Sequence, residues 1–395
     1  MHPMQARLTV DHCLPRDLDR AHLIARVFVP ELDGPIVARV TREGVIDLSR
    51  IAPTTSMLFE LDDPVSAIDE LPSVRPIAAL DIVLRQSDPR ARNAGGTHFL
   101  APCDLQALKA SGVTFVSSML ERVIEEQARG DPARAEGVRR AIVSVIGENL
   151  RAVKPGSSEA AKLKEVLVAQ GVWSQYLEVG IGPDAEIFTK AQPMSAVGLG
   201  ADIGIHPQSA WNNPEPEIVL AVNGRGRTVG ATLGNDVNLR DFEGRSALLL
   251  GKAKDNNASC AIGPFIRLFD DRFTIDDVRK AHLTLHIEGD DGFVLDGESS
   301  MSQISRDPLD LVSHAIGPNH QYPDGLMLFL GTMFAPTKDR HGPGQGFTHD
   351  LGDIVTIATP TLGALVNRVQ RSDRIAPWTF GAGALMRNLA KRGLL

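Results

Sequence analysis

A pair of carboxylates followed directly by an apolar run is the feature of this sequence that most constrains its fold. Glu215-Pro-Glu217 leads directly into Ile-Val-Leu-Ala-Val222, and the composition of that run predicts a buried strand. Side chains two residues apart on a strand point to the same face, so Glu215 and Glu217 are expected to face one way. A third carboxylate, in Gly-Asn-Asp236, lies in the next strand-like segment. Three oxygen ligands can therefore converge there, which is the set that Mg²⁺ or Mn²⁺ prefers.

The composition narrows the class of protein. A chain of 395 residues with 43% apolar residues can bury a large core, and its length predicts two domains. A formal net charge of −8 without a block of like charge gives no reason to expect a nucleic acid or a membrane as partner, so a small molecule is the expected ligand. The cysteines Cys13, Cys103 and Cys260 are too widely spaced for a thiolate metal site and odd in number. With no signal core and no membrane-span pattern, the expected location is the cytoplasm.

The order of the predicted elements suggests a small N-terminal domain, residues 1–104, followed by a catalytic domain, residues 105–395. The first domain has the pattern of short strands and turns. After a short strand at 113–116 and a helix at 119–129, two more helical segments are expected to form an insertion or lid, and strands dominate the remainder. The expected class is α+β, β-dominated. The predicted helices are 119–129, 132–150, 158–169 and 307–316, and the clearest predicted strands are 23–29, 36–40, 45–48, 218–222, 261–268, 283–287, 326–330 and 353–357.

A series of motifs follows the carboxylates in order. Taken alone, Glu-x-Glu beside prolines is usually a solvated strand end, and Gly-Asn-Asp is common turn chemistry. The ordered set is more specific, and over roughly residues 112–369 it resembles the fumarylacetoacetate hydrolase superfamily. The motifs that carry the resemblance are Glu215-x-Glu217, Asp236-Val-Asn-Leu-Arg240-Asp, Lys254, Ile-Gly-Pro264, Leu-Gly-Thr332, Gly-Asp353-Ile-Val, Ile-Phe-Thr-Lys190 and Leu-Gly-Ala-Leu-Val-Asn367-Arg-Val.

The resemblance implies a compact β-roll catalytic domain with a divalent metal, Mg²⁺ or Mn²⁺, bound by Glu215, Glu217 and Asp236. The metal would chelate the 1-carboxylate and 2-oxo group of a 2-keto acid and stabilise its enolate. The active-site lysine of the family falls on Lys254, with Lys252 as the competing assignment. This lysine would stabilise charge or transfer a proton near the reacting carbon.

Three further positions match places where the family contacts its substrate. Thr332 fits the position that holds the substrate carboxylate, and its plainer interpretation is a strand-end turn residue. Lys190 and Arg240 also match family positions, although either can be a structural ion-pair partner. Since the family tends to form dimers or dimers of dimers, a homodimer or dimer of dimers is expected.

The segment that opens the first predicted helix departs from the family hydrolases. Those enzymes commonly carry a His and, three residues later, a Glu, which together activate the attacking water. This chain has Ser118 and Glu121 instead. The Ser-x-x-Glu pattern is also a capping box, and both interpretations can hold together. A second departure is Glu243, where acylpyruvate-cleaving members tend to have Gln. It is either an additional acid–base group or a surface carboxylate.

Without the histidine, the chain resembles the dehydratase branch that acts on 2-keto-3-deoxy sugar acids. There Glu121 or Lys254 would remove the C3 proton, and the C4 hydroxyl would leave with acid assistance. A 2-keto-3-deoxypentonate would then give 2,5-dioxopentanoate. His341 or His349, in the loop after Thr332, can supply the acid. The alternatives are a hydrolase that splits 2,4-diketo acids such as acylpyruvates, and a metal-stabilised binding protein without turnover.

Overall fold

A long mixed sheet forms the centre of the molecule. The computed structural model describes residues 3–72, 74–93, 96–146, 153–169, 171, 173–334 and 336–395, without the side chains of residues 116–118 and 140–146. In that part of the chain the sheet has eleven strands in the order β4-β3-β2-β1-β13-β11-β10-β16-β6-β7, with β5 paired to β1. They are β1 (Leu23–Val29), β2 (Gly34–Val40), β3 (Gly44–Asp47), β4 (Ala78–Ala79), β5 (His98–Leu100), β6 (Ala107–Ser111), β7 (Ile187–Ala191), β10 (Pro216–Val222), β11 (Thr228–Asp236), β13 (Cys260–Leu268) and β16 (Leu326–Phe329).

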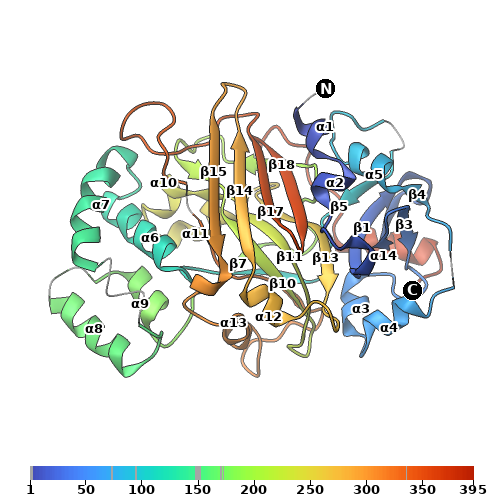
Figure 1. The fold of residues 1–395 in the computed structure, drawn as a ribbon, viewed down its shortest axis with the longest axis horizontal. Helices are drawn as coiled ribbons and strands as arrows, with labels where there is room; N and C mark the ends of the chain where they lie inside the picture. Colours follow the sequence, from blue (N-terminus) through green and yellow to red (C-terminus); the bar gives the residue numbers. More distant parts are fainter. Residues whose placement is uncertain are drawn as a thin grey trace.

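A second sheet of five strands in the described residues packs against this one, and Figure 1 shows them together in the middle of the molecule. Its order is β15-β14-β17-β18-β8. The main hydrophobic core joins the two sheets: Ile218 and Leu220 of β10 share it with Leu285 of β14 and Ile357 of β17. The remaining strands are β8 (Asp202–Ile205), β9 (Asn212–Asn213), β12 (Asn238–Leu239), β14 (His282–Glu288), β15 (Val294–Ser300), β17 (Ile354–Thr359) and β18 (Gly363–Arg371).

Strand β10 confirms the prediction made from its composition. Every residue of β10 is buried, because the strand lies between β11 and β16 and both of its faces are covered. A strand of this kind is a continuous apolar run rather than an alternating one. The expected α+β class with a sheet-rich core is confirmed.

Helices lie at the two ends of the sheets (Figure 1). At one end the predicted helical insertion, α7 and α8, packs with α6 and with α9, a helix that was not predicted, and the four share a hydrophobic core that includes Met119, Leu167 and Leu177. The predicted helix over 132–150 lies outside the described residues beyond 146. The helices are α1 (Pro3–Arg7), α2 (Val10–Cys13), α3 (Thr55–Glu60), α4 (Pro64–Asp69), α5 (Leu80–Gln86), α6 (Val116–Ala128), α7 (Pro132–Ile146), α8 (Ser158–Ala169), α9 (Gln175–Ile181), α10 (Arg240–Glu243), α11 (Leu250–Lys254), α12 (Ile275–Arg279), α13 (Pro308–Ala315) and α14 (Ala382–Lys391).

Two local predictions are wrong. The short strand at 113–116 is absent, because Val113 has a left-handed backbone with φ of 46° and the chain enters α6 at Val116. The N-terminal segment also holds helices α3, α4 and α5 besides its strands. They are too short to show a helical period, and their signals are local, such as the Thr54 side chain that accepts the Met57 N–H at the start of α3.

The N-terminal segment extends the central sheet, because β1 pairs with β13 of the catalytic part, with Leu23 opposite Arg267. The C-terminal helix α14 returns to this end, where the Asn388 side chain donates to the carbonyl of Leu32. A boundary at residue 104 therefore stays a prediction. No helix in the described residues is long and apolar enough to cross a membrane.

Candidate active site

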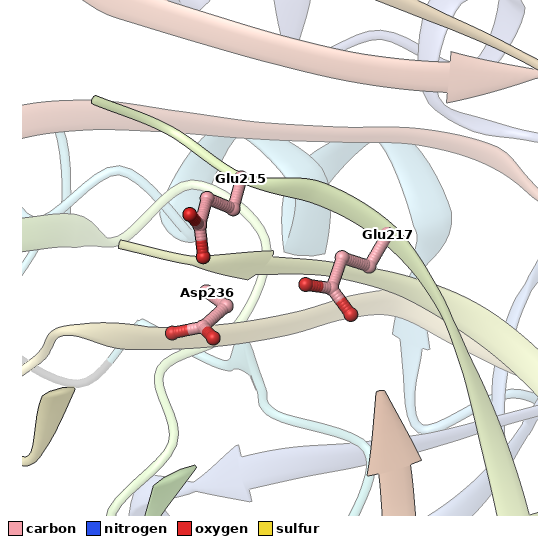
Figure 2. Close-up of side chains that lie close together, drawn as sticks. All are labelled: Glu215, Glu217 and Asp236. Carbon is pink, nitrogen blue, oxygen red and sulfur yellow. The ribbon is translucent and has the colours of Figure 1, made fainter. Parts of the chain in front are cut away.

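Three buried carboxylates meet where β10 begins and β11 ends. Glu215 directly precedes β10, Glu217 is its second residue, and Asp236 is the last residue of β11. The two strands are antiparallel neighbours with Pro216 opposite Asn235, which brings both glutamates beside Asp236. Figure 2 shows the three side chains turned toward a common space. Each offers an oxygen within 4.8 Å of the others, so the convergence predicted from the sequence is present.

The electrostatics of this cluster favour a bound cation. Burial and the neighbouring Asp236 and Glu215 carboxylates raise the pKa of Glu217 well above its ordinary value. Burial also works against the charge of Asp236, but Lys190 and Lys254 outweigh it and lower the pKa of that carboxyl. Three carboxylates crowded in a space of low dielectric repel one another, and a dication relieves that repulsion directly. The donor set therefore fits Mg²⁺ or Mn²⁺.

Lys254 lies against the same carboxylates. Its Nζ is 2.7 Å from Glu215 Oε2 and 3.0 Å from Asp236 Oδ2, and its side chain is buried. Burial opposes its charge, yet the Asp236 and Glu215 carboxylates outweigh burial and raise its pKa. The competing candidate Lys252 is exposed, with Nζ 4.9 Å from the ring centre of Phe242. The structure thus brings Lys254, and not Lys252, to the predicted metal ligands.

Lys190 contacts Asp236 on the side away from the cavity. Its fully buried Nζ lies 2.8 Å from Asp236 Oδ1 and donates to the carbonyls of Lys254 at 2.7 Å and Val237 at 3.2 Å. An ammonium has three donors, so these three partners use them all. Lys190 does not line the cavity beside the carboxylates. Its position is therefore that of a residue that orients Asp236, a predicted metal ligand, and its contact with the substrate stays a prediction.

The loop after β16 orients Glu217. The Gly331 N–H donates to Glu217 Oε2 at 2.7 Å, and the Thr332 hydroxyl lies 3.3 Å from Glu217 Oε1. Gly331 has φ of 98°, and a Cβ there would fall 1.9 Å from Thr114 Oγ1, so this approach needs glycine. Thr332 also lines the cavity, where its hydroxyl can meet a ligand.

Helix α6 contributes an arginine that sequence reasoning missed. Arg122 contacts Glu215 through Nη2, and its Nη1 lies 2.7 Å from Glu125 Oε2 and 3.0 Å from Glu243 Oε2. All four side chains are buried. Glu243 lines the cavity, as expected for a group near the metal. Arg240 lies one layer further out, where Nε is 3.3 Å from Glu125 Oε1, so it does not reach the cavity predicted to hold the substrate.

Ser118 and Glu121 occupy the positions where the family hydrolases carry their water-activating His and Glu. Glu121 faces helix α7, where Arg139 Nη2 lies 2.7 Å from Glu121 Oε2, and it does not line the cavity. Arg122 and Glu125 are three residues apart and both face the site, whereas the side chain of Glu121 lies about 100° around the helix from that of Arg122, toward α7. The side chain of Ser118 lies outside the described residues.

Glu186 is a second residue that sequence reasoning missed. It directly precedes β7 and lines the cavity with Glu215, Glu217 and Lys254. Burial and the nearby Glu243 carboxylate raise the pKa of Glu186 to about 7. A Cβ added at Gly112 would fall 1.8 Å from Glu186 Oε2, so the bare backbone of Gly112 makes room for this carboxylate.

The loop histidines lie elsewhere. His349 is fully buried with Nδ1 2.9 Å from Asp353 Oδ2, and Asp353 is held in turn by Arg340. His341 is exposed, with Nε2 3.3 Å from Asp350 Oδ1. Neither ring lines the cavity beside the carboxylates, so their positions do not support a role as the acid.

The family follows from comparison with known proteins. The family described as fumarylacetoacetate (FAA) hydrolase C-terminal matches residues 147–370, so the chain belongs to the fumarylacetoacetate hydrolase family, as its motifs predict. It is 30% identical over 268 residues to a probable 2-keto-3-deoxyxylonate dehydratase of Haloferax volcanii, which covers 67% of this chain and 86% of that protein. It is also 30% identical over 193 residues to a 2-dehydro-3-deoxy-D-arabinonate dehydratase of Saccharolobus solfataricus, covering 48% of this chain and 60% of that protein.

Solved structures share the fold. A 2-keto-3-deoxy-D-arabinonate dehydratase complexed with magnesium and 2,5-dioxopentanoate has a TM-score of 0.60 at 21% identity, over 90% of this chain and 100% of that chain. A fumarylacetoacetate hydrolase of Exiguobacterium antarcticum has a TM-score of 0.52 at 15% identity, over 89% of this chain and 100% of the other. At these identities the similarity establishes the fold and not the reaction.

Proposed function

We propose that this protein is a Mg²⁺-dependent lyase that dehydrates a 2-keto-3-deoxypentonate to 2,5-dioxopentanoate. The observation that carries the proposal is the buried cluster of Glu215, Glu217 and Asp236 with Lys254 against it. Two relatives at 30% identity bear the names of dehydratases of such acids, and a structure of the same fold holds magnesium and 2,5-dioxopentanoate.

The three carboxylates are proposed to hold Mg²⁺, since hard oxygen ligands suit that ion. When bound, the ion polarises the 2-oxo group of the substrate and makes the adjacent C3 proton more acidic. Thr332 is proposed to donate its hydroxyl to the substrate carboxylate, because it stands at the wall of the same cavity. Lys190, Arg122 and, through Glu125, Arg240 keep the carboxylates in place.

Lys254 is proposed to take the C3 proton at Nζ as the neutral amine. Among the lysines of the described residues it is the one that lines the cavity. Burial favours that form, and in the metal-free protein the Asp236 and Glu215 carboxylates oppose it; a dication held by the same carboxylates would offset their effect and leave the Nζ lone pair free for the proton. Proton removal at C3 prepares the loss of the hydroxyl from C4.

Glu186 is proposed to donate a proton to the departing C4 hydroxyl. Burial and the Glu243 carboxylate raise the pKa of Glu186 to about 7, which keeps a useful share of the acid form near neutral pH. Glu243 is a poorer candidate, because Arg122 Nη1 lies 3.0 Å from its Oε2 and occupies that oxygen.

The reaction balances without an oxidant or reductant. A proton from C3 and the hydroxyl from C4 leave as one water and form a C3–C4 double bond. Loss of a C5 proton and protonation at C3 give the enol of an aldehyde, which is protonated at C4 and loses the proton of its C5 hydroxyl to yield 2,5-dioxopentanoate. The protein has only to move protons between C3, C4 and C5 and to stabilise the charge that develops at the 2-oxo group.

The test supplies purified protein with Mg²⁺ and, in separate reactions, both C4 epimers of 2-keto-3-deoxypentonate and an acylpyruvate. We expect 2,5-dioxopentanoate from at least one epimer by mass spectrometry, and no turnover after chelation of the metal. Pyruvate release from the acylpyruvate, with neither epimer dehydrated, would establish the hydrolase alternative instead. Assembly as a homodimer or dimer of dimers, also proposed, is tested by sedimentation of the same sample.

A further inference from the structure

A second cavity lies beside the metal-ligand cluster. The cavity among the carboxylates and Lys254 has a volume of about 10 Å³, and its neighbour has a volume of about 130 Å³. Glu186 and Glu243 belong to the walls of both. The larger space, here named the tail cavity, is completed by Gln175, Tyr176, Val179, Ala247 and Leu250.

The small cavity cannot hold a whole sugar acid. About 10 Å³ is the space that a single water molecule requires. A metal ion and the head of a 2-keto acid therefore need Lys254 to move away, and the remaining carbons need room elsewhere. Glu186 and Glu243 stand between the two spaces, so the tail cavity is where a chain attached to that head can continue.

The two cavities lie along one short helix. Helix α11 begins at Leu250 in the wall of the tail cavity and ends at Lys254 in the wall of the small cavity. A carbon chain that starts at the head of the substrate can therefore run beside α11 from one cavity to the other.

We propose that the tail cavity binds the hydroxyl-bearing C4–C5 end of the substrate and sets the chain length that the enzyme accepts. This inference rests on the proposed function. Glu186 and Glu243 accept hydrogen bonds from hydroxyl groups, whereas the half-buried Val179 and Leu250 present apolar side chains that offer a further hydroxyl no partner. Apolar walls of this kind disfavour an added methylene or hydroxyl by about 10–200-fold.

The helical insertion supplies one wall of this cavity. Tyr176 and Val179 come from α9, which packs with α6 in the core of the insertion, whereas Ala247 and Leu250 come from the catalytic part. On the outer side Gln175 Nε2 donates to Glu126 Oε1 at 2.8 Å and ties α9 to α6. Helix α9, which packs beside the predicted lid, thus helps to determine the size of the tail cavity.

The first test fills the cavity by Ala247→Trp, with Leu248→Trp as the matched control. The neighbouring Leu248 side chain is 95% exposed, so a larger residue there meets no wall. Two reactions are compared in Mg²⁺: dehydration of 2-keto-3-deoxypentonate, and exchange of the C3 protons of pyruvate for deuterium by NMR. Pyruvate has the head of the substrate and no tail. We expect the ratio of dehydration to exchange to fall at least tenfold in Ala247→Trp and to stay within twofold of wild type in Leu248→Trp.

The outcomes separate the two proposals. A wild-type protein that neither exchanges pyruvate protons nor dehydrates the pentonate overturns the proposed function. A wild-type protein active in both, with an unchanged ratio in Ala247→Trp, overturns the tail cavity alone.

A second variant covers the case in which Ala247→Trp does not fold. Val179→Ala enlarges the cavity, and the kcat/KM for a 2-keto-3-deoxyhexonate relative to the pentonate is expected to rise at least fivefold. An unchanged ratio overturns the assignment.

Discussion

The substitution Glu217→Gln tests the metal site most directly, because the structure predicts two separate effects. In the metal-free protein, burial and the carboxylates of Asp236 and Glu215 raise the pKa of Glu217, so its protonated form already resembles a neutral amide. The Gln side chain keeps an oxygen for the Gly331 N–H, which Glu217 now accepts at 2.7 Å. The free energy of unfolding without metal is therefore expected to change by no more than about 1 kcal/mol.

With metal, the same substitution removes one of three charged ligands. At a free Mg²⁺ concentration one hundred times Kd, binding to the wild-type protein adds about 2.7 kcal/mol to its stability. An unfolding entropy of about 2.1 cal/mol/K per residue gives about 0.8 kcal/mol/K for 395 residues, so the corresponding rise in Tm is about 3 °C. Glu217→Gln is expected to lose most of this rise together with Mg²⁺-dependent turnover.

The assay is thermal unfolding over a Mg²⁺ titration, with dehydration measured on the same samples. Glu298→Gln is the matched control, because Glu298 is an exposed strand glutamate on β15, far along the chain from the carboxylate cluster. The control should retain both the Tm rise and the turnover. Equal Mg²⁺ stabilisation and turnover in Glu217→Gln would refute the metal assignment. If Glu217→Gln did not fold without metal, the argument that Glu217 is protonated in the metal-free protein would be refuted instead.

Three further predictions concern residues around the cluster. Arg122→Met leaves the buried carboxylates that Arg122 now contacts without a partner, so it should lower the free energy of unfolding in urea by about 3–5 kcal/mol. The control Arg139→Met removes a more exposed ion pair and should lower it by about 0–1 kcal/mol; equal losses would contradict the role given to Arg122. The pKa of Glu186 is raised to about 7, so its acid form is lost as pH rises through that value. The kcat should accordingly fall above about pH 7. In Glu186→Gln, kcat should be lower by about 10²–10⁴-fold and should no longer fall above pH 7. If the fall with pH persists in this variant, it belongs to the titration of another group. Lys254→Met should abolish the exchange of pyruvate protons while preserving the stabilisation by Mg²⁺. The control Lys252→Met should change neither property. Persistent exchange in Lys254→Met would exclude Lys254 as the base.

The elements that could be predicted are those whose signal is local and strong. Strand β10 is an unbroken apolar run because both of its faces are covered, and α6 shows a helical period over 13 residues. Short elements gave no such signal. Val113 and Val116 favour a strand by composition, but the left-handed backbone at Val113 and the packing of Phe115 in the core turn the chain into α6 instead. Tertiary packing decides such a segment, and local preference does not.

The same distinction between local signals and tertiary packing explains which residues of the site could be predicted from the sequence. Glu215, Glu217 and Asp236 lie on two antiparallel neighbours close in sequence, so strand periodicity alone brings them together. Arg122 and Glu186 reach the cavity from α6 and from the start of β7, and their positions depend on how the insertion and the edge of the sheet pack. Two-residue alternation did contain a signal, because Glu186, just before β7, and Phe188 both line the cavity, and Lys190 was already matched to the family. The alternation could not predict how far each side chain lies from the cavity. Lys190 lies at an irregularity in the pairing of β6 with β7 and ends behind Asp236 with every donor used, whereas Glu186 ends in the cavity wall with room for a substrate. Glu186 and Lys190 thus take different roles because of what packs over each of them.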